Sequence, residues 1–140
     1  MKSSVLTEAS TVWLLNNDYG LDLKLSKDFC SYDAEDSRYI VEIKNRRKYY
    51  DTKLVEAMKL YTNYQKSQLK GKDFLYVVTD EKGVFIYNIT KEIKNIVRLN
   101  AKVMKQPAST DFSSSKWINK CIYELPESLA GTKKIWNNEC

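Results

Sequence analysis

The sequence contains no histidine among its 140 residues. This absence excludes a Ser-His-Asp hydrolase, a Cys-His protease, and any nuclease that needs a histidine base or zinc ligand. Cysteine is also scarce: the three residues Cys30, Cys121 and Cys140 are odd in number and lack metal-ligand spacing. They predict reduced thiols. Any chemistry must therefore use carboxylates, lysines, tyrosines or a bound ion.

Glycine and proline are rare as well, at four and two residues, so no linker or second domain is visible. The length suits one domain over residues 1–140, and 43% hydrophobic residues suffice for a core without disulfides. No stretch approaches the roughly 20 apolar residues of a membrane span. The first four residues are not followed by the apolar run of a signal peptide. We therefore expect a cytoplasmic protein with no membrane association.

Apolar spacing predicts an α/β domain with the core order helix, strand, strand, helix, strand, strand. A period of three or four indicates helices, and alternation or a short β-branched run indicates strands. Residues 30–37 are polar and turn-like, residues 90–104 fit helix or strand equally, and residues 108–116 are expected to form a loop. The expected helices cover residues 5–15 and about 52–69, and the expected strands cover residues 21–25, 39–44, 74–78, 84–87 and, as the last one, 117–125.

Charged side chains gather on one face of the first two expected strands. Glu42 and Lys44 are two residues apart, so both project opposite the apolar face of their strand. If the turn is centred near residue 32 or 33, Asp22 falls across from Glu42 or Lys44. Facing residues of an antiparallel pair have Cβ atoms only about 5 Å apart. The same pairing puts the leucines of the first strand with the apolar face of the second.

Other aspartates compete with Asp22 for this position. Asp33 and Asp36 fall in or beside the expected turn, too far along the hairpin from Glu42. Asp28 shares the strand parity of Asp22 but lies about 20 Å nearer the turn on an extended strand. The spacing therefore favours Asp22.

Such a group of charges suits phosphodiester hydrolysis. Two carboxylates hold Mg²⁺, which prefers oxygen ligands and keeps several waters. The ion neutralises the phosphate and lowers the pKa of an attacking water. A lysine beside the carboxylates orients or deprotonates that water, or binds the phosphate.

Asp22 followed by Glu42-Ile43-Lys44 at the end of a hydrophobic strand resembles the PD-(D/E)xK nuclease superfamily, which includes restriction endonucleases, Holliday-junction resolvases and RecB-like nuclease domains. The resemblance covers roughly residues 8–87. It implies a restriction-endonuclease-like fold, with a mixed central sheet flanked by helices. It also implies Mg²⁺ as cofactor, with Mn²⁺ as a substitute. The implied catalytic residues are Asp22, Glu42, Lys44 and Glu8, and the implied metal contacts are Asp22, Glu42, Ile43 and Glu8.

A basic run, Arg46-Arg47-Lys48, follows Lys44 directly. Together with Lys24 and Lys59, these cations are candidates for contacts with nucleic-acid phosphates, and Tyr49 and Tyr50 are candidates for stacking on unpaired bases. The alternative interpretation is an ordinary solvated charge cluster.

The leading hypothesis is a divalent-metal-dependent DNA endonuclease, structure-selective or of low sequence specificity because no recognition domain is visible. Two cuts need two centres, so a homodimer is one expectation, with residues 84–87 or a tail containing Trp117 and Trp136 as the interface. A second hypothesis is an inactive nucleic-acid-binding or assembly module on the same fold. A third is a structural protein with a surface ion-pair network. Richness in Lys, Asn, Ile and Tyr fits an AT-rich genome such as that of a phage, in which case the location is the host cytoplasm.

Overall fold

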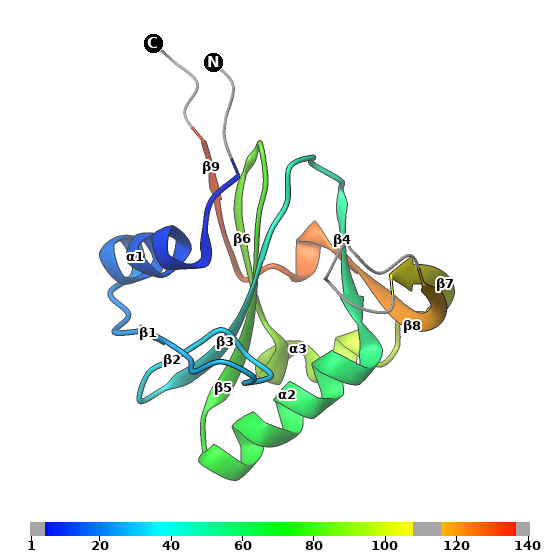
Figure 1. Cartoon of the computed structure of the whole chain (residues 1–140), viewed down its shortest axis with the longest axis horizontal. Helices are drawn as coiled ribbons and strands as arrows, with labels where there is room; N and C mark the ends of the chain where they lie inside the picture. The colour runs from blue at the N-terminus through cyan, green and yellow to red at the C-terminus, as the bar shows by residue number, and fades with distance from the viewer. Residues whose placement is uncertain (1–4, 108–115, 137–140) are drawn as a thin grey trace.

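The computed structural model of the chain describes residues 5–107 and 116–136. The helices are α1 (Glu8–Tyr19), α2 (Ala57–Lys70) and α3 (Ile89–Ile96), with a short 3-10 helix at Glu127–Leu129. The strands are β1 (Lys24–Leu25), β2 (Ala34–Glu35), β3 (Tyr39–Asn45), β4 (Thr52–Glu56), β5 (Asp73–Thr79), β6 (Gly83–Asn88), β7 (Lys102–Pro107), β8 (Trp117–Pro126) and β9 (Thr132–Ile135). The predicted α/β class is confirmed (Figure 1).

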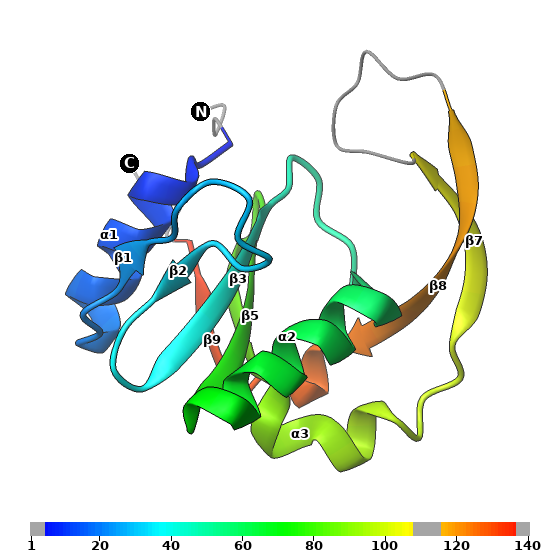
Figure 2. The same ribbon diagram turned by 60° about the horizontal axis from the view of Figure 1, so that its bottom comes forward.

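Two sheets form the framework. The larger has the order β1-β2-β3-β5-β6-β9 and is mixed, because β3 and β5 are parallel whereas its other neighbours are antiparallel. The smaller is antiparallel, with the order β4-β8-β7. Helix α1 lies on one side of the larger sheet, and α2 and α3 lie on the other (Figures 1 and 2). The central sheet is therefore mixed and flanked by helices.

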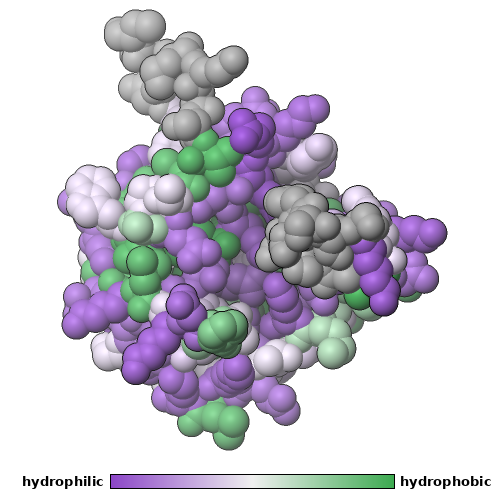
Figure 3. Space-filling view, viewed as in Figure 1, coloured by the Kyte–Doolittle hydropathy of each residue, from purple (hydrophilic) through white to green (hydrophobic). Residues whose placement is uncertain are grey.

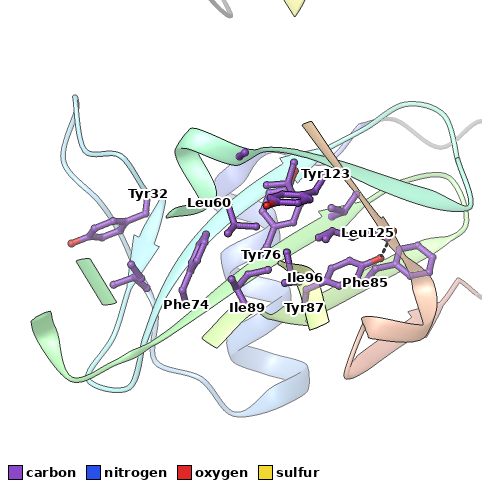
Figure 4. Close-up of a cluster of buried hydrophobic side chains, with 14 residues drawn as sticks. Tyr32, Leu60, Phe74, Tyr76, Phe85, Tyr87, Ile89, Ile96, Tyr123 and Leu125 are labelled. Atoms are coloured by element: carbon purple, nitrogen blue, oxygen red, sulfur yellow. Dashed lines mark hydrogen bonds between the residues drawn. The ribbon is translucent and has the colours of Figure 1, made fainter. Parts of the chain in front are cut away.

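Each face of the larger sheet has its own apolar core. On one face, Val12 and Leu15 of α1 pack with Val41 and Ile43 of β3. On the other, Leu60 of α2 joins a cluster that includes residues of α3, β5, β6 and β8, drawn in Figure 4. Strands β3 and β5 contribute to both clusters, which is why they are nearly continuous apolar runs.

The smaller sheet is fastened to the second core through β8. Tyr123 and Leu125 are buried there, and the Tyr87 hydroxyl donates to the Leu125 carbonyl at 3.5 Å (Figure 4). Beyond this anchored part, β7 and β8 continue as a curved two-stranded arm beside α2 (Figure 2). Residues of the arm and of β3 line one cavity.

Several sequence predictions need correction. The expected strand over residues 21–25 is reduced to β1, which pairs with β2 and not with β3. Strand β2 lies inside the segment expected to be a turn. The helix expected from about residue 52 begins at Ala57, because residues 52–56 form β4 and pair with β8. Strand β8 agrees with its prediction but is not the last strand, since β9 follows.

The first interface suggested for a dimer is also wrong. Residues 84–87 are buried in the larger sheet, each at most 8% exposed. Trp136 packs partly buried against the α1-side core, and its indole N–H donates to the Asp80 carbonyl at 2.7 Å. Trp117 is exposed. In the view of Figure 3, hydrophobic residues lie in small separate groups amid polar ones.

Cys30 and Cys121 are free and exposed, in line with reduced thiols. Cys140 and most of the loop expected at residues 108–116 lie outside the described residues. None of the described helices has the length and apolar character needed to cross a membrane.

Gly83 is required by the close approach of β9. A Cβ at this position would lie 2.0 Å from the Lys134 carbonyl oxygen, a backbone atom that cannot move without β9. We expect Gly83→Ala to lower the free energy of unfolding by about 1–3 kcal/mol, the usual range for overpacking. Gly131→Ala is the matched control, because nothing lies within 4 Å of its Cβ position. Urea unfolding measures both, and equal stability of the two variants would contradict the prediction.

Candidate active site

The aspartate that faces Glu42 is Asp33. In the antiparallel pairing of β2 with β3, Ala34 is opposite Val41, so the next residue pair outward is Asp33 with Glu42. The Asp33 N–H donates to the Val41 carbonyl at 2.8 Å, and the Ile43 N–H donates to Asp33 Oδ2 at 2.6 Å. The Asp33 carboxylate is therefore held against the backbone of β3, next to Glu42.

The predicted pairing of Asp22 with Glu42 is wrong. Asp22 is exposed, and its backbone N–H donates to Asp36 Oδ2 at 3.2 Å, at the far end of the β2–β3 hairpin. The reason is the position of the turn. Asp36 Oδ1 accepts hydrogen bonds from the N–H groups of Arg38 and Tyr39, both at 2.8 Å, so the chain reverses at residues 36–39. An aspartate that opens a turn in this way was the signal available in the sequence.

Glu42 occupies a recessed position on the α2 side of the larger sheet. Only 5% of it is exposed. Asn63 of α2, which is fully buried, donates to Glu42 Oε1 at 3.0 Å and also to the Ser31 carbonyl at 3.0 Å. The Lys44 ammonium lies 3.6 Å from Glu42 Oε2. Both carboxylate oxygens thus have a partner, and Asn63 ties Glu42 to the chain leading into Asp33.

The surroundings of Glu42 and Asp33 disfavour the ionised form of both carboxylates. Burial raises the pKa of Glu42, as does the charge of Asp33, while Lys44 and Lys59 lower it without reversing the effect. Burial likewise raises the pKa of Asp33, against the lowering by the Ile43 N–H and the two lysines. Burial and the mutual charge of the two carboxylates thus act together against their ionised forms, and a nearby positive charge favours those forms.

Glu8 reaches the same electrostatic environment from the start of α1. Burial raises its pKa, the charge of Asp33 raises it further, and the charge of Lys44 lowers it. Of the predicted catalytic residues, the structure brings together Glu42 and Lys44, with Asp33 in place of Asp22, whereas Glu8 is exposed at the start of α1 and lines neither cavity beside Glu42. Ile43 lies between Glu42 and Lys44 and uses its N–H to hold Asp33.

Two cavities meet at this cluster. The larger, about 550 Å³, runs from β3 and the start of α2 to the inner face of β8 and β7, and we call it the groove. The smaller, about 420 Å³, lies between the segment around Cys30 and the first turns of α2. Glu42, Lys44 and Lys59 line both. The charged cluster is therefore reached from two sides.

The predicted nucleic-acid contacts divide into two groups. Arg46, Lys48 and Lys59 line the groove, whereas Arg47 and Lys24 are exposed elsewhere. None of the three groove cations forms an ion pair within residues 5–107 and 116–136. Their positive charge is thus available to an anionic ligand.

Two further groove cations, Lys53 and Lys120, were not predicted from the sequence, and both form ion pairs. The Lys53 ammonium is almost fully buried, 3.3 Å from Asp80 Oδ2 and 4.1 Å from the centre of the Phe85 ring. Lys120 of β8 lies 3.5 Å from Glu56. Lys53 falls in the segment predicted to be helical, whereas it lies in β4, where the strand directs its side chain inward. The first pair links β4 to the end of β5 in the larger sheet, and the second links two neighbouring strands of the smaller sheet.

The donor set fits Mg²⁺. Asp33 and Glu42 supply two carboxylates that face each other at the edge of an open cavity. Within the described part of the chain, no three acidic or cysteine side chains converge as a ready-made metal cage. Mg²⁺ is usually bound through one or two carboxylates and keeps several waters, so a third protein carboxylate is not required.

Comparison with family models, curated proteins and solved structures gives no match.

Asn63 is expected to stabilise the site through Glu42. Replacing it with alanine leaves Glu42 Oε1 and the Ser31 carbonyl without this donor in a buried setting. An unsatisfied buried polar group costs about 1–3 kcal/mol, so Asn63→Ala should lower the free energy of unfolding by that amount. Gln65→Ala, at an exposed position of the same helix, should change it by less than about 0.5 kcal/mol. Denaturant unfolding of both variants checks this, and similar values would contradict it.

Glu35 gives the hairpin a pH dependence. Burial alone would raise its pKa, but hydrogen bonds from Lys72, Lys70 and Tyr32 lower it to about 2. Because the folded-state pKa lies below the ordinary 4.5, these contacts stabilise the fold above about pH 4.5, and the contribution disappears as the pH falls towards 2.

We therefore expect Glu35→Gln to cost about 1 kcal/mol near neutral pH, since the partners are partly solvent-exposed. The difference from wild type should shrink steadily below about pH 4.5 and also at high salt. Unfolding titrations across this range measure it. A difference that stays constant with pH would show that ionisation of Glu35 is irrelevant.

Proposed function

We propose that this protein is a Mg²⁺-dependent nuclease of restriction-endonuclease-like fold that hydrolyses phosphodiester bonds in DNA. The observation that carries the proposal is the pairing of Asp33 with Glu42 across β2 and β3, with Lys44 two residues further on the same face. The order of α1, the β-hairpin, α2 and β5 around this group supports the fold assignment. Mn²⁺ is the expected substitute ion.

Each residue has a distinct task in this scheme. A bound Mg²⁺ would supply charge neutralisation at the phosphate and a more acidic water. Asp33 and Glu42 would hold it. The Lys44 ammonium, a pure hydrogen-bond donor, binds a non-bridging phosphate oxygen and stabilises the charge that develops as water attacks phosphorus. Asn63 keeps Glu42 in place.

The groove supports a nucleic-acid substrate. Arg46, Lys48 and Lys59 are available to backbone phosphates, next to the carboxylates that would perform the chemistry. Contacts to phosphates position a substrate without reading its sequence. A DNA endonuclease of low sequence specificity, or one that selects a DNA structure, follows from this lining.

Mutation distinguishes the two aspartates, Asp33 and Asp22, that are candidates for the metal ligand. Asp33→Asn should reduce Mg²⁺-dependent cleavage by about 100-fold or more, because it removes a metal ligand and its charge. Asp22→Asn should retain cleavage, because Asp22 is exposed and remote from Glu42. Labelled DNA incubated with Mg²⁺, Mn²⁺ or EDTA gives the measurement.

Thermal unfolding of both variants controls for loss of the fold. Full cleavage by Asp33→Asn would overturn the assigned site, and equal loss in both variants would remove the distinction drawn from the β2–β3 register. If wild type binds DNA but cleaves none with either ion, the inactive binding module is the better description.

A further inference from the structure

The groove is walled by alternate residues of strands from both sheets. On β3 and the chain that follows it, Glu42, Lys44, Arg46 and Lys48 line one wall. On the opposite side, β8 contributes every second residue, Lys120, Ile122 and Glu124, and β7 contributes Met104, Gln106 and Pro107. The period of two is that of strands presenting one face to the same space. The arm formed by β7 and β8 thus limits the groove on its outer side (Figure 2).

The lining combines apolar surface with unpaired positive charge. The apolar part consists of Leu54, Val78, Met104 and Ile122, and the cations without an ion pair among the described residues are Arg46, Lys48 and Lys59. Tyr50 also lines the groove and is 63% exposed, so its ring is accessible. Binding of the phosphate backbone alone would require only the positively charged side chains. Apolar walls and an accessible tyrosine ring suit the flat faces of bases, on which aromatic side chains stack.

The dimensions favour a single strand. A volume of about 550 Å³ lies within the range of sites for one small ligand, about 300–1,000 Å³. This is space on the order of one or two nucleotides. Glu42 is recessed, at 5% exposure, and the arm stands opposite it. A duplex is a stiff rod with its base faces stacked inside, so it offers the groove neither a thin strand nor a free base.

We propose that the groove binds an unpaired segment of DNA, which passes between β3 and the β7–β8 arm to reach Glu42 and Lys44. Its bases lie on Tyr50 and the apolar wall, and its phosphates lie on Arg46 and Lys48. Lys59 and Lys44 line the smaller cavity as well, so the strand continues there beyond the cluster. This inference rests on the proposed nuclease function for its biological meaning, but the binding is measurable without cleavage.

The first test is binding by fluorescence anisotropy in EDTA, which prevents metal-dependent cleavage. The probes are one oligonucleotide as a single strand, as a full duplex, and as a duplex with a single-stranded overhang. The single strand and the overhang should bind about tenfold or more tightly than the duplex. Tyr50→Ala should weaken single-strand binding about tenfold, since one stacked base is lost. Trp13→Ala, an equally exposed aromatic change on α1, should leave it unchanged.

Charge is tested by salt dependence. Removing two phosphate contacts with Arg46→Ala and Lys48→Ala should make the logarithmic salt slope less steep by about 1.4, at 0.7 per contact for a single strand. The matched pair Lys91→Ala and Lys94→Ala, exposed on α3, should leave the slope unchanged. Equal slopes for the two double variants would overturn the assigned path of the strand.

Cleavage mapping on the overhang substrate separates this inference from the proposed function. Mg²⁺-dependent cuts in the unpaired segment would support both. A second outcome is cleavage in the duplex, with equal binding of single strand and duplex and no effect of Tyr50→Ala. It would overturn the proposed single-strand binding but not the proposed nuclease function. Tyr50-dependent binding of single strands without any cleavage would remove the nuclease function and leave the groove. Absence of binding to every probe would overturn the inference.

Discussion

The buried carboxylate of Glu42 is the constraint around which this fold is arranged. A charged group in the interior is tolerated only when partners compensate its loss of water. Asn63 of α2 and Lys44 of β3 are such partners of Glu42. The charge of Asp33, just before β2, acts in the opposite direction and raises the pKa of Glu42. Burying this carboxylate lowers the free energy of unfolding, and the apolar cores on both faces of the sheet offset that loss. This is the pattern expected where structure has been adjusted for binding or catalysis.

The cavity beside Glu42 is lined by residues of both sheets. Glu42 lies on the larger sheet, but the space in front of it is completed by β8 and β7 of the smaller one. The smaller sheet is held against the larger one by Tyr123 and Leu125 in the core and by the ion pair of Lys53 in β4 with Asp80 after β5. The groove therefore depends on the β7–β8 arm, whose outer part stands opposite the charged cluster.

The antiparallel pair of carboxylates predicted from the sequence is present, but Asp33 takes the place of Asp22. Two carboxylates facing each other across an antiparallel pair, with a lysine two residues on, is the arrangement found, and the apolar faces of α1 and β3 meet as their spacing predicts. Asp22 does not face Glu42 because the alternating leucines of residues 21–25 do not form a long strand beside β3. Leu23 is buried in the core on the α1 side, but only two residues of the segment pair with another strand, which is β2.

What the sequence by itself determined is the α/β class, the strands β3, β5 and β6, and the face on which Glu42 and Lys44 project. These follow from local periodicity, which depends on neighbours along the chain. The tertiary structure alone decided which aspartate meets Glu42, that residues 52–56 are a strand, and that β7 and β8 form a wall of the groove. Each depends on pairing between distant segments, where a turn capped by Asp36 or a partner strand such as β8 outweighs the local pattern.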